Sequence, residues 1–249
     1  MITDSFDNKT EPLMSLKDFY GDKKEIIEIC LVIFLKEIYE YILKTYECEV
    51  IGNIKACNGE YPIYKFNYEG KVLGFYLTMI GSTMSSQFVI ETSWITGATK
   101  FIMFGSSGSL NKEITTNKYV IPKEAYRDEG MSYHYAPASD YITIKNHSIV
   151  KKIFDELHLP NVEGKIWTTD AFLRETKGQV AKRKEEGCIA VEMGIAGVQS
   201  VCDFHNLDLY SFIVTGDVLS EEKYEVGGLR NANHSLDKFF VALEIAKRI

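Results

Sequence analysis

Glu192 and Asp217 are the two residues whose type and position best suit catalysis. Glu192 follows the apolar run Cys188–Val191, Asp217 comes after a second one, Leu209–Val214, and both runs are typical of buried strands. Apolar residues at helical spacing from Ile195 to Cys202 predict a helix between them. If the strands are parallel neighbours, a right-handed crossover brings their carboxyl ends to one sheet edge, where open α/β sheets bind ligands. The pattern predicts one carboxylate that holds a polyol and another that protonates a leaving group.

A second candidate is the glycine- and serine-rich stretch Gly105–Ser109, which follows a strand predicted over Lys100–Phe104. Glycine lets the backbone approach a ligand, and the N–H and hydroxyl groups can donate to an anion or a sugar. Gly105 and Ser106 are therefore candidates for ligand contacts. The stretch has neither the GK[ST] of a Walker loop nor a GxGxxG pattern, so a tight turn without a ligand is the alternative.

The elements that must position these residues alternate between helices and strands. Residues 1–21 are polar and predict an arm that lies over the surface or reaches a neighbouring subunit. Patterning then predicts helices over 23–45, capped by Asp22, from 80–82 to Gly97, and over 148–157, 177–186 and 233–249. It also predicts a hairpin of 62–68 and 71–79 turning at Glu69-Gly70, strands over 119–122 and 165–168, a loop over 124–135 and a turn over 169–172. This alternation predicts a single three-layer α/β/α domain over residues 1–249.

Composition narrows the class of partner. The 249 residues are 45% hydrophobic and carry a formal net charge of −7, which argues against a nucleic-acid binder with its basic stripe. No apolar run approaches the roughly 18 to 20 residues of a membrane span, and the N-terminus does not resemble a signal peptide. We expect a cytoplasmic protein that binds a small molecule and neither nucleic acid nor membrane.

The cysteines and histidines give no metal-ligand pattern. The five cysteines lack CxxC spacing, and the five histidines show no HExxH. An odd number of unpatterned cysteines suits reduced thiols. We therefore predict no metal and no disulfide framework.

The motifs FIMFGSSGSL (101–110), EAYRDEGMSYHYAP (124–137), TTDAF (168–172), AVEMGIAG (190–197) and TGD (215–217) occur in an order that resembles the nucleoside phosphorylase superfamily. This resemblance implies a twisted, mixed central sheet that closes partly into a barrel, flanked by helices. It also implies a homo-oligomer, either a dimer or a trimer of dimers. The implied reaction is cleavage of a ribose–base bond through an oxocarbenium-like transition state, attacked by phosphate or by water.

The resemblance also implies roles for individual residues. Glu192 and Met193 match the ribose-binding pair, and Phe172 matches the aromatic that lines the base pocket. Asp217 matches the acid that protonates N7 of a purine. Ser106, after Gly105, matches the hydroxyl of the acceptor loop. No cofactor is implied beyond inorganic phosphate as a possible co-substrate.

Among the positions that depart from the family pattern, two concern the ribose and the phosphate. Gly194 stands where most members have a second glutamate that grips the ribose, and Met103 stands where phosphorylases carry an arginine. Three hypotheses therefore stay open: a purine nucleoside phosphorylase, a nucleosidase using water that Glu11 or Glu60 could activate, and a non-catalytic nucleoside-binding or storage protein. The phosphorylase is the expectation that family breadth supports.

Each candidate also has a purely structural interpretation. Glu192 could cap the following helix, and Asp217 could close an Asx turn. Met193 and Phe172 could be ordinary core residues. These alternatives predict side chains that do not share a cavity.

Arg127 and His134, within 124–137, are further candidates for the site or a subunit interface. The alternative for Arg127 is a surface salt-bridge cluster with Asp128 and Glu129. For His134 the alternative is a structural role.

Overall fold

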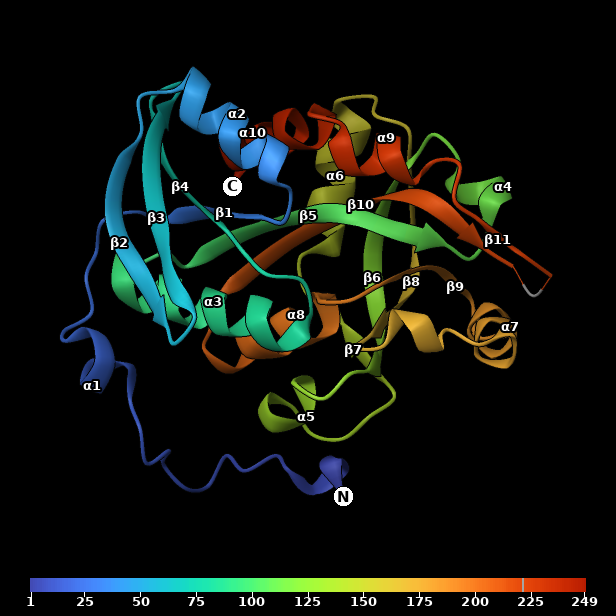
Figure 1. Ribbon diagram of the computed structural model, residues 1–249, viewed down its shortest axis with the longest axis horizontal. Coiled ribbons are helices and arrows are strands. Elements are labelled where there is room, and N and C mark those ends of the chain that lie inside the picture. The colour runs from blue at the N-terminus through green and yellow to red at the C-terminus, as the bar shows by residue number, and fades with distance from the viewer. Residues whose placement is uncertain (221) are drawn as a thin grey trace.

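A computed structural model describes residues 1–220 and 222–249, and it contains one mixed sheet of eleven strands (Figure 1). In chain order the strands are β1 Ile29–Ile33, β2 Glu49–Ala56, β3 Gly59–Tyr68, β4 Lys71–Leu77, β5 Lys100–Ser109, β6 Tyr119–Asp128, β7 Tyr141–Thr143, β8 Asn161–Thr169, β9 Cys188–Glu192, β10 Asp208–Leu219 and β11 Tyr224–Glu225. The α-helices are α1 Leu16–Tyr20, α2 Lys36–Thr45, α3 Ser82–Thr96, α4 Lys112–Thr115, α5 Ser132–Tyr135, α6 His147–Glu156, α7 Lys177–Glu185, α8 Ile195–Phe204, α9 Leu229–His234 and α10 Asp237–Arg248. Two 3₁₀ turns, η1 Ile2–Asp4 and η2 Phe172–Arg174, complete the described elements.

Strand β5 is the centre of the sheet. It pairs in parallel with β1 on one side and with β10 on the other, and its last residues pair antiparallel with β9. Strands β10, β6, β8 and β9 follow one another and return to β5, so this part of the sheet closes on itself. The expected α/β fold with a twisted, partly closed mixed sheet between helices is confirmed.

The other half of the sheet is an open extension. Strands β4, β3 and β2 continue outward from β1. The β3–β4 hairpin turns at Glu69-Gly70, where both residues have positive φ (44° and 84°), as a two-residue hairpin turn requires. The predicted hairpin is confirmed, as is α3 with Gly97 as its left-handed C-cap.

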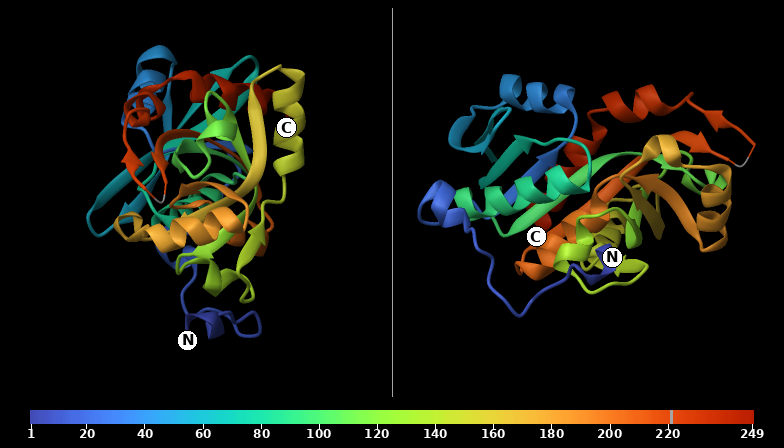
Figure 2. Two further views of the ribbon diagram at one scale, coloured as in Figure 1. Left: turned by 90° about the vertical axis from the view of Figure 1, so that its right-hand side faces the viewer. Right: turned by 60° about the horizontal axis from the view of Figure 1, so that its bottom comes forward.

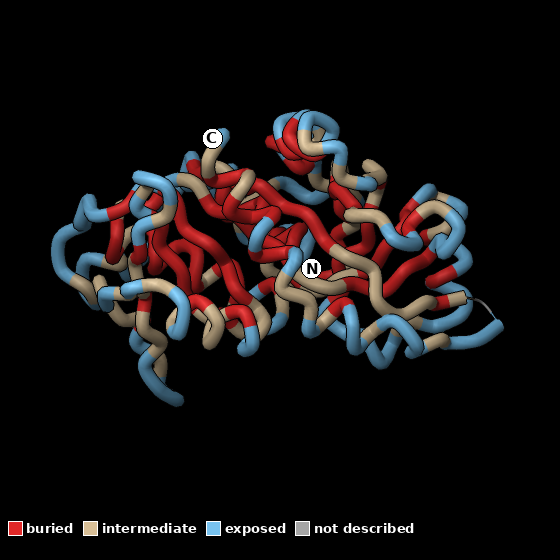
Figure 3. Tube along the Cα trace, turned by 90° about the horizontal axis from the view of Figure 1, so that it is seen from above, coloured by how far each residue is buried: buried red, intermediate tan, exposed pale blue. Residues whose placement is uncertain are grey.

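Helices cover the sheet on two sides (Figures 1 and 2). In Figure 1, α2, α9 and α10 lie above the central strands, and α3, α5 and α8 lie below them. Two apolar clusters fill these layers, one including Phe88, Val198 and Cys202, the other including Phe75 and Phe212. Figure 3 shows the buried residues following the central strands.

The helix predicted over 23–45 is wrong in its first half. Ile29–Ile33 forms β1, all five residues are buried, and α2 begins only at Lys36. A continuous apolar run fits either a buried helix or a strand that lies between two parallel neighbours, and β4 and β5 supply those neighbours.

Three other boundaries also differ from the predictions. Gly105–Ser109 continues β5 instead of forming a loop, and residues 124–128 extend β6 beyond its predicted end. The helix predicted over 233–249 is divided between α9 and α10, because Ser235 between them is extended. In the first two cases, pairing with a strand distant in the sequence overrides the local pattern. In the third case, the extended backbone of Ser235 ends the helix.

The acids of β9 and β10 are joined through β5. The crossover argument assumed that β9 and β10 are neighbours, and this assumption is wrong. Gly108 of β5 instead pairs with Val191 of β9 on one side and with Asp217 of β10 on the other. A Cβ at Gly108 would lie 2.4 Å from Leu219 and 3.0 Å from Val191. Glycine therefore allows β9 and β10 to approach each other across the end of β5.

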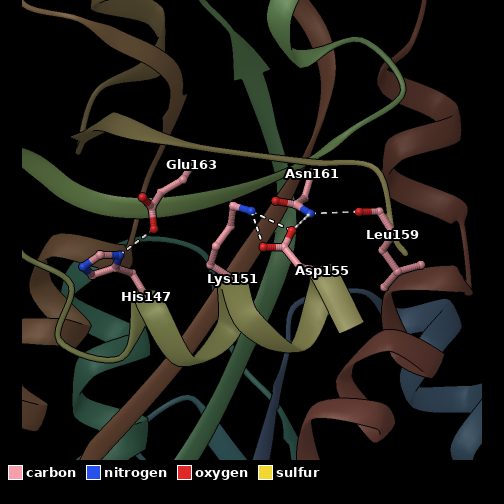
Figure 4. A network of polar contacts seen from close by, with 6 residues as sticks. All are labelled: His147, Lys151, Asp155, Leu159, Asn161 and Glu163. Carbon is pink, nitrogen blue, oxygen red and sulfur yellow. Dashed lines mark hydrogen bonds and ion pairs between the residues drawn. The ribbon is translucent and has the colours of Figure 1, made fainter. Parts of the chain in front are cut away.

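The periphery is held by polar contacts. Helix α6 is attached to β8 through His147 Nδ1 and Glu163 Oε1, 2.6 Å apart, and through Asn161, which donates to Asp155 Oδ1 (Figure 4). The N-terminal arm extends from the body (Figure 2), and Trp94 Nε1 donates to Gly21 O at its end. Its role at a subunit interface, like the expected homo-oligomer, stays a prediction. Within the described ranges, none of the helices has the length and apolar character needed to cross a bilayer.

Candidate functional site

A cavity of about 920 Å³ opens where β5, β9 and β10 meet. Its lining combines the carboxyl halves of these strands with the segment after β1, with η2 and with α9. The predicted residues that line it are Gly105, Ser106, Phe172, Glu192, Met193 and Asp217. The structure therefore brings together the two acids, the aromatic and the glycine–serine stretch, although they come from distant parts of the chain.

The Glu192 carboxylate is held by the protein at the end of β9. Oε1 accepts from Thr168 Oγ1 at 2.5 Å, and Oε2 accepts from the backbone N–H groups of Gly194 and Ile195 at 2.6 and 2.9 Å. Burial raises the pKa of Glu192 to about 7, and these hydrogen bonds oppose the increase. A carboxylate offers about four lone-pair sites, so this one caps α8 and can still accept from a ligand hydroxyl.

The cavity wall beside Glu192 is crowded and apolar. Met103 and Met193 both line the cavity, and Ser82 Oγ donates to Met193 O at 3.2 Å. A Cβ at Gly194 would lie 3.2 Å from Met103 Cε and 3.2 Å from Ser85 Oγ. The two departures noted in the sequence, Gly194 and Met103, are therefore spatial neighbours.

Asp217 lies at a β-bulge in β10, where the register with β5 shifts between Thr215 and Asp217. Glu175, which follows η2, lines the same cavity, and sequence analysis missed it. Burial and the neighbouring Asp217 charge raise the pKa of Glu175 to about 7. Burial and the same Asp217 carboxylate raise the pKa of Tyr224 in β11. Only the position of Glu175 shortly after Phe172 could have suggested it.

A second group of residues, from β5, α2 and α9, was not revealed by the sequence. Ser106 Oγ donates to Asn233 Oδ1, and the next residue of α9, His234, has its Nδ1 2.8 Å from Glu37 Oε1. A backbone hydrogen bond lowers the pKa of Glu37, and His234 adds to this effect. Lys36 lines the cavity beside Glu37. The sequence analysis missed these residues because it placed Lys36 and Glu37 inside a helix predicted over 23–45, and Asn233 and His234 inside one predicted over 233–249.

Arg127 and His134 do not line the cavity. Arg127 is 3% exposed, so the surface-cluster interpretation is wrong. Its Nε donates to Ser132 Oγ, one Nη donates to Pro137 O, and its guanidinium lies 4.2 Å from the Tyr133 ring centre. These contacts fix the loop after β6. A role for either residue at a subunit interface stays a prediction.

Other expectations concern carboxylates and metals. Glu11 and Glu60 are exposed and lie outside the cavity lining, so neither is placed to activate a water there. Over residues 1–220 and 222–249, no three His, Cys, Asp or Glu side chains gather as metal ligands would.

Comparison with known proteins finds relatives in sequence and in fold. A DeoD-type purine nucleoside phosphorylase of Bacillus cereus is 25% identical over 183 residues, which are 72% of this chain and 76% of that protein. The futalosine hydrolase of Helicobacter pylori strain 26695 superposes with a TM-score of 0.71 at 18% identity, covering 90% of this chain and 99% of that one. The 5′-methylthioadenosine/S-adenosyl homocysteine nucleosidase of Campylobacter jejuni gives the same TM-score and identity, covering 90% and 100%.

At these identities the solved structures establish the fold alone. A family model extends the likeness over most of the sequence, because the one described as the phosphorylase superfamily matches residues 28–244. This match includes every residue that lines the cavity. The chain therefore belongs to the phosphorylase superfamily.

Proposed function

We propose that this protein is an enzyme that cleaves the N-glycosidic bond of a purine nucleoside in the cavity between β5, β9 and β10. The observation that carries the proposal is that Glu192 and Asp217, from different strands, line one cavity of about 920 Å³. Pockets for small ligands have volumes of roughly 300–1,000 Å³. The names of the relatives add support, since they are nucleoside phosphorylases and nucleosidases.

The two acids have complementary roles in this reaction. As the bond between C1′ and the base nitrogen breaks, its electron pair leaves with the base and positive charge develops on the sugar. The Glu192 carboxylate stabilises that charge and accepts from a sugar hydroxyl. Asp217, beside Glu175, delivers a proton to the departing base, and the acceptor oxygen completes the exchange at C1′.

The geometry favours water as the acceptor. Ser106 uses its one proton on Asn233 Oδ1, so its oxygen presents lone pairs, which suit a water proton better than a phosphate oxygen. Glu37, which lines the same cavity, is a carboxylate at neutral pH that can take a proton from that water. A negative carboxylate at this place also repels phosphate.

Phosphate is the second candidate acceptor. Lys36 lies in the first turn of α2 and lines the cavity, so its ammonium group and the helix N-terminus could hold an anion. The curated relatives are phosphorylases by name, which agrees with the expectation from the sequence. In the described lining the basic side chains are lysines and a histidine, which lack the bidentate geometry of arginine.

Incubation with a nucleoside panel, with and without inorganic phosphate, tests the proposal. Adenosine, inosine and uridine would be supplied in phosphate-free buffer and the free base measured by chromatography. Base release that does not depend on phosphate, with ribose as the second product, is expected. Release only with phosphate, giving ribose 1-phosphate, establishes the second candidate. If a nucleoside raises the melting temperature of the protein but no nucleoside in the panel releases free base, the enzyme assignment is overturned in favour of a binding protein.

A further inference from the structure

Helix α9 brings a histidine to the cavity, beside the carboxylate proposed as the base. His234 Nδ1 lies 2.8 Å from Glu37 Oε1, and both residues line the cavity. Glu37 stands in the first turn of α2 and His234 at the end of α9, so the contact joins helices from opposite ends of the chain. A group that takes a proton works best when its direction is fixed before the reaction.

From this contact we infer that His234 is a positioning residue, whose Nδ1–H holds the Glu37 carboxylate in the direction from which it takes a proton from the attacking water. The inference rests on the proposed function, since it needs a nucleoside and a water in the cavity. It deepens that function by adding a residue that acts through Glu37.

The donor and acceptor roles in this contact follow from the chemistry of the two groups. An ionised carboxylate only accepts hydrogen bonds, so the proton must be on Nδ1 of His234. Glu37 is ionised at neutral pH, because its own backbone N–H donates to the carboxylate and lowers its pKa. A carboxylate has about four lone-pair sites, so these two donors leave room for a water. The neighbouring Lys36 is directed elsewhere, since its Nζ lies 3.5 Å from Glu40 Oε1.

Helix α9 is held firmly enough to support Glu37. Asn233 Oδ1 accepts from Ser106 Oγ of β5. The Ala232 carbonyl accepts from Lys238 Nζ, whose side chain is 1% exposed. The helix also packs directly on β10, because a Cβ at Gly216 would lie 2.7 Å from Ala232 Cβ. These contacts fix α9 at three places, so the residue after Asn233 is presented to α2 at a defined position.

The expected effect is confined to the step in which water attacks. The water oxygen forms the new bond to C1′ and the water gives one proton to Glu37, while the base leaves with the electrons of the old bond and receives a proton from Asp217. Glu37 then loses its proton to solvent, and Asp217 regains one. A base displaced by about 1 Å can slow such a step about 100-fold. Loss of His234 should therefore lower kcat and leave KM little changed.

The alternative is an ion pair that only joins α9 to α2. The side chains of His234 and Glu37 are both about half exposed, and exposed ion pairs contribute little to stability. The pair of His147 and Glu163, 2.6 Å apart between α6 and β8, is a matched control because it is of the same kind and lies outside the cavity lining (Figure 4). Under the alternative, His234→Ala and His147→Ala should both leave kcat unchanged.

Release of free base in phosphate-free buffer, from the nucleoside that is cleaved fastest, tests the inference through kcat and KM. We expect His234→Ala to lower kcat about 10-fold to 100-fold. His234→Asn should recover most of this loss, since its amide nitrogen can donate in place of Nδ1. In Glu37→Gln, which lacks the base itself, adding His234→Ala should lower kcat no further. His147→Ala should leave kcat unchanged.

Melting curves confirm that each variant is folded. An unchanged kcat in His234→Ala, or equal losses in His234→Ala and His234→Asn, overturns the inference while cleavage by the unmodified protein keeps the proposed function. Full additivity of the Glu37 and His234 losses also overturns it, because His234 would then act independently of Glu37. If the unmodified protein releases no base from any nucleoside, the proposed function is overturned and the inference with it.

Discussion

Two acidic groups line the cavity: Glu192 on β9, called here the Glu192 end, and Asp217 with Glu175, called the Asp217 end. The pKa values of Glu192 and Glu175 are raised similarly, but by different combinations of causes. Burial raises the pKa of both Glu192 and Glu175 to about 7. At Glu192, hydrogen bonds from one side chain and two backbone N–H groups oppose this effect and favour the ionised form. At Glu175, the nearby Asp217 adds to the effect of burial and favours the protonated form.

This difference gives the two ends different chemistry. A carboxylate that the protein already satisfies is fixed in direction, so Glu192 can meet a sugar hydroxyl without reorganisation. Burial and the charge of Asp217 let Glu175 keep a proton near neutral pH, and a proton is what a leaving base needs. The comparison therefore predicts that changes at the Asp217 end affect mainly the bond-breaking step, whereas changes at the Glu192 end also affect sugar binding and stability.

The largest effect is expected from Asp217→Asn. This change removes an acid from the proton-donating end, so we expect base release from a purine nucleoside to fall about 100-fold to 10,000-fold, in kcat more than in KM. Single-turnover measurements of free base test this. Asp140→Asn, at an exposed acid outside the cavity, is the control and should not change the rate. An unchanged rate in Asp217→Asn would remove the acid assignment.

An intermediate effect is expected from Glu192→Gln. Loss of a charged group that accepts from the sugar and stabilises the charge developing on it should lower kcat/KM roughly 10-fold to 100-fold, through both KM and kcat. The folded pKa of about 7 lies above the ordinary 4.5, so the folded state holds more protons between these values and stability falls as pH rises through them. The variant should flatten this fall by about 1–3 kcal/mol.

Chemical denaturation at pH 5 and at pH 8 measures that change in stability. Glu175 contributes a fall of the same sign, so Glu192→Gln should reduce the pH dependence without abolishing it. A full pH dependence in Glu192→Gln would mean that the carboxylate is already ionised at low pH, and the contrast between the two ends would then be wrong.

The sequence predicted the elements around Glu192, but it did not predict that Glu175 and Glu37 line the cavity. The strand–helix–strand unit around Glu192 was predictable because its apolar runs and its helical spacing are local signals. That Glu192 would cap α8 was anticipated as an alternative, and the structure shows that it also lines the cavity.

The remaining contributors come from segments with no local signal. Glu175 follows a turn within a charged stretch, and Glu37 lies in a segment whose apolar run fitted a helix as well as a strand. Only pairing with β4 and β5 decides that the run is β1, and only this brings Glu37 to the cavity. Sequence periodicity does not contain such tertiary information.

The smallest effect is expected from Gly194→Ala, at the crowded wall beside Glu192. The new Cβ would lie 3.2 Å from Met103 Cε, the end of a flexible side chain that can shift by a few tenths of an ångström. We therefore expect a loss of about 1 kcal/mol in the free energy of unfolding, measured by denaturant titration. Gly178→Ala is the control, because Gly178 lies in α7 with no atom within 4 Å of the added Cβ, and alanine should stabilise that helix.

A second substitution shows whether Met103 causes this loss. In Met103→Ala the side chain that crowds position 194 is shortened, so adding Gly194→Ala should then cost less than it does in the unmodified protein. The coupling energy of the double-mutant cycle is expected to be about 0.5 kcal/mol or more. If it is zero, Met103 does not cause the loss, and Ser85 Oγ, which also lies 3.2 Å from the added Cβ, is the group that restricts position 194.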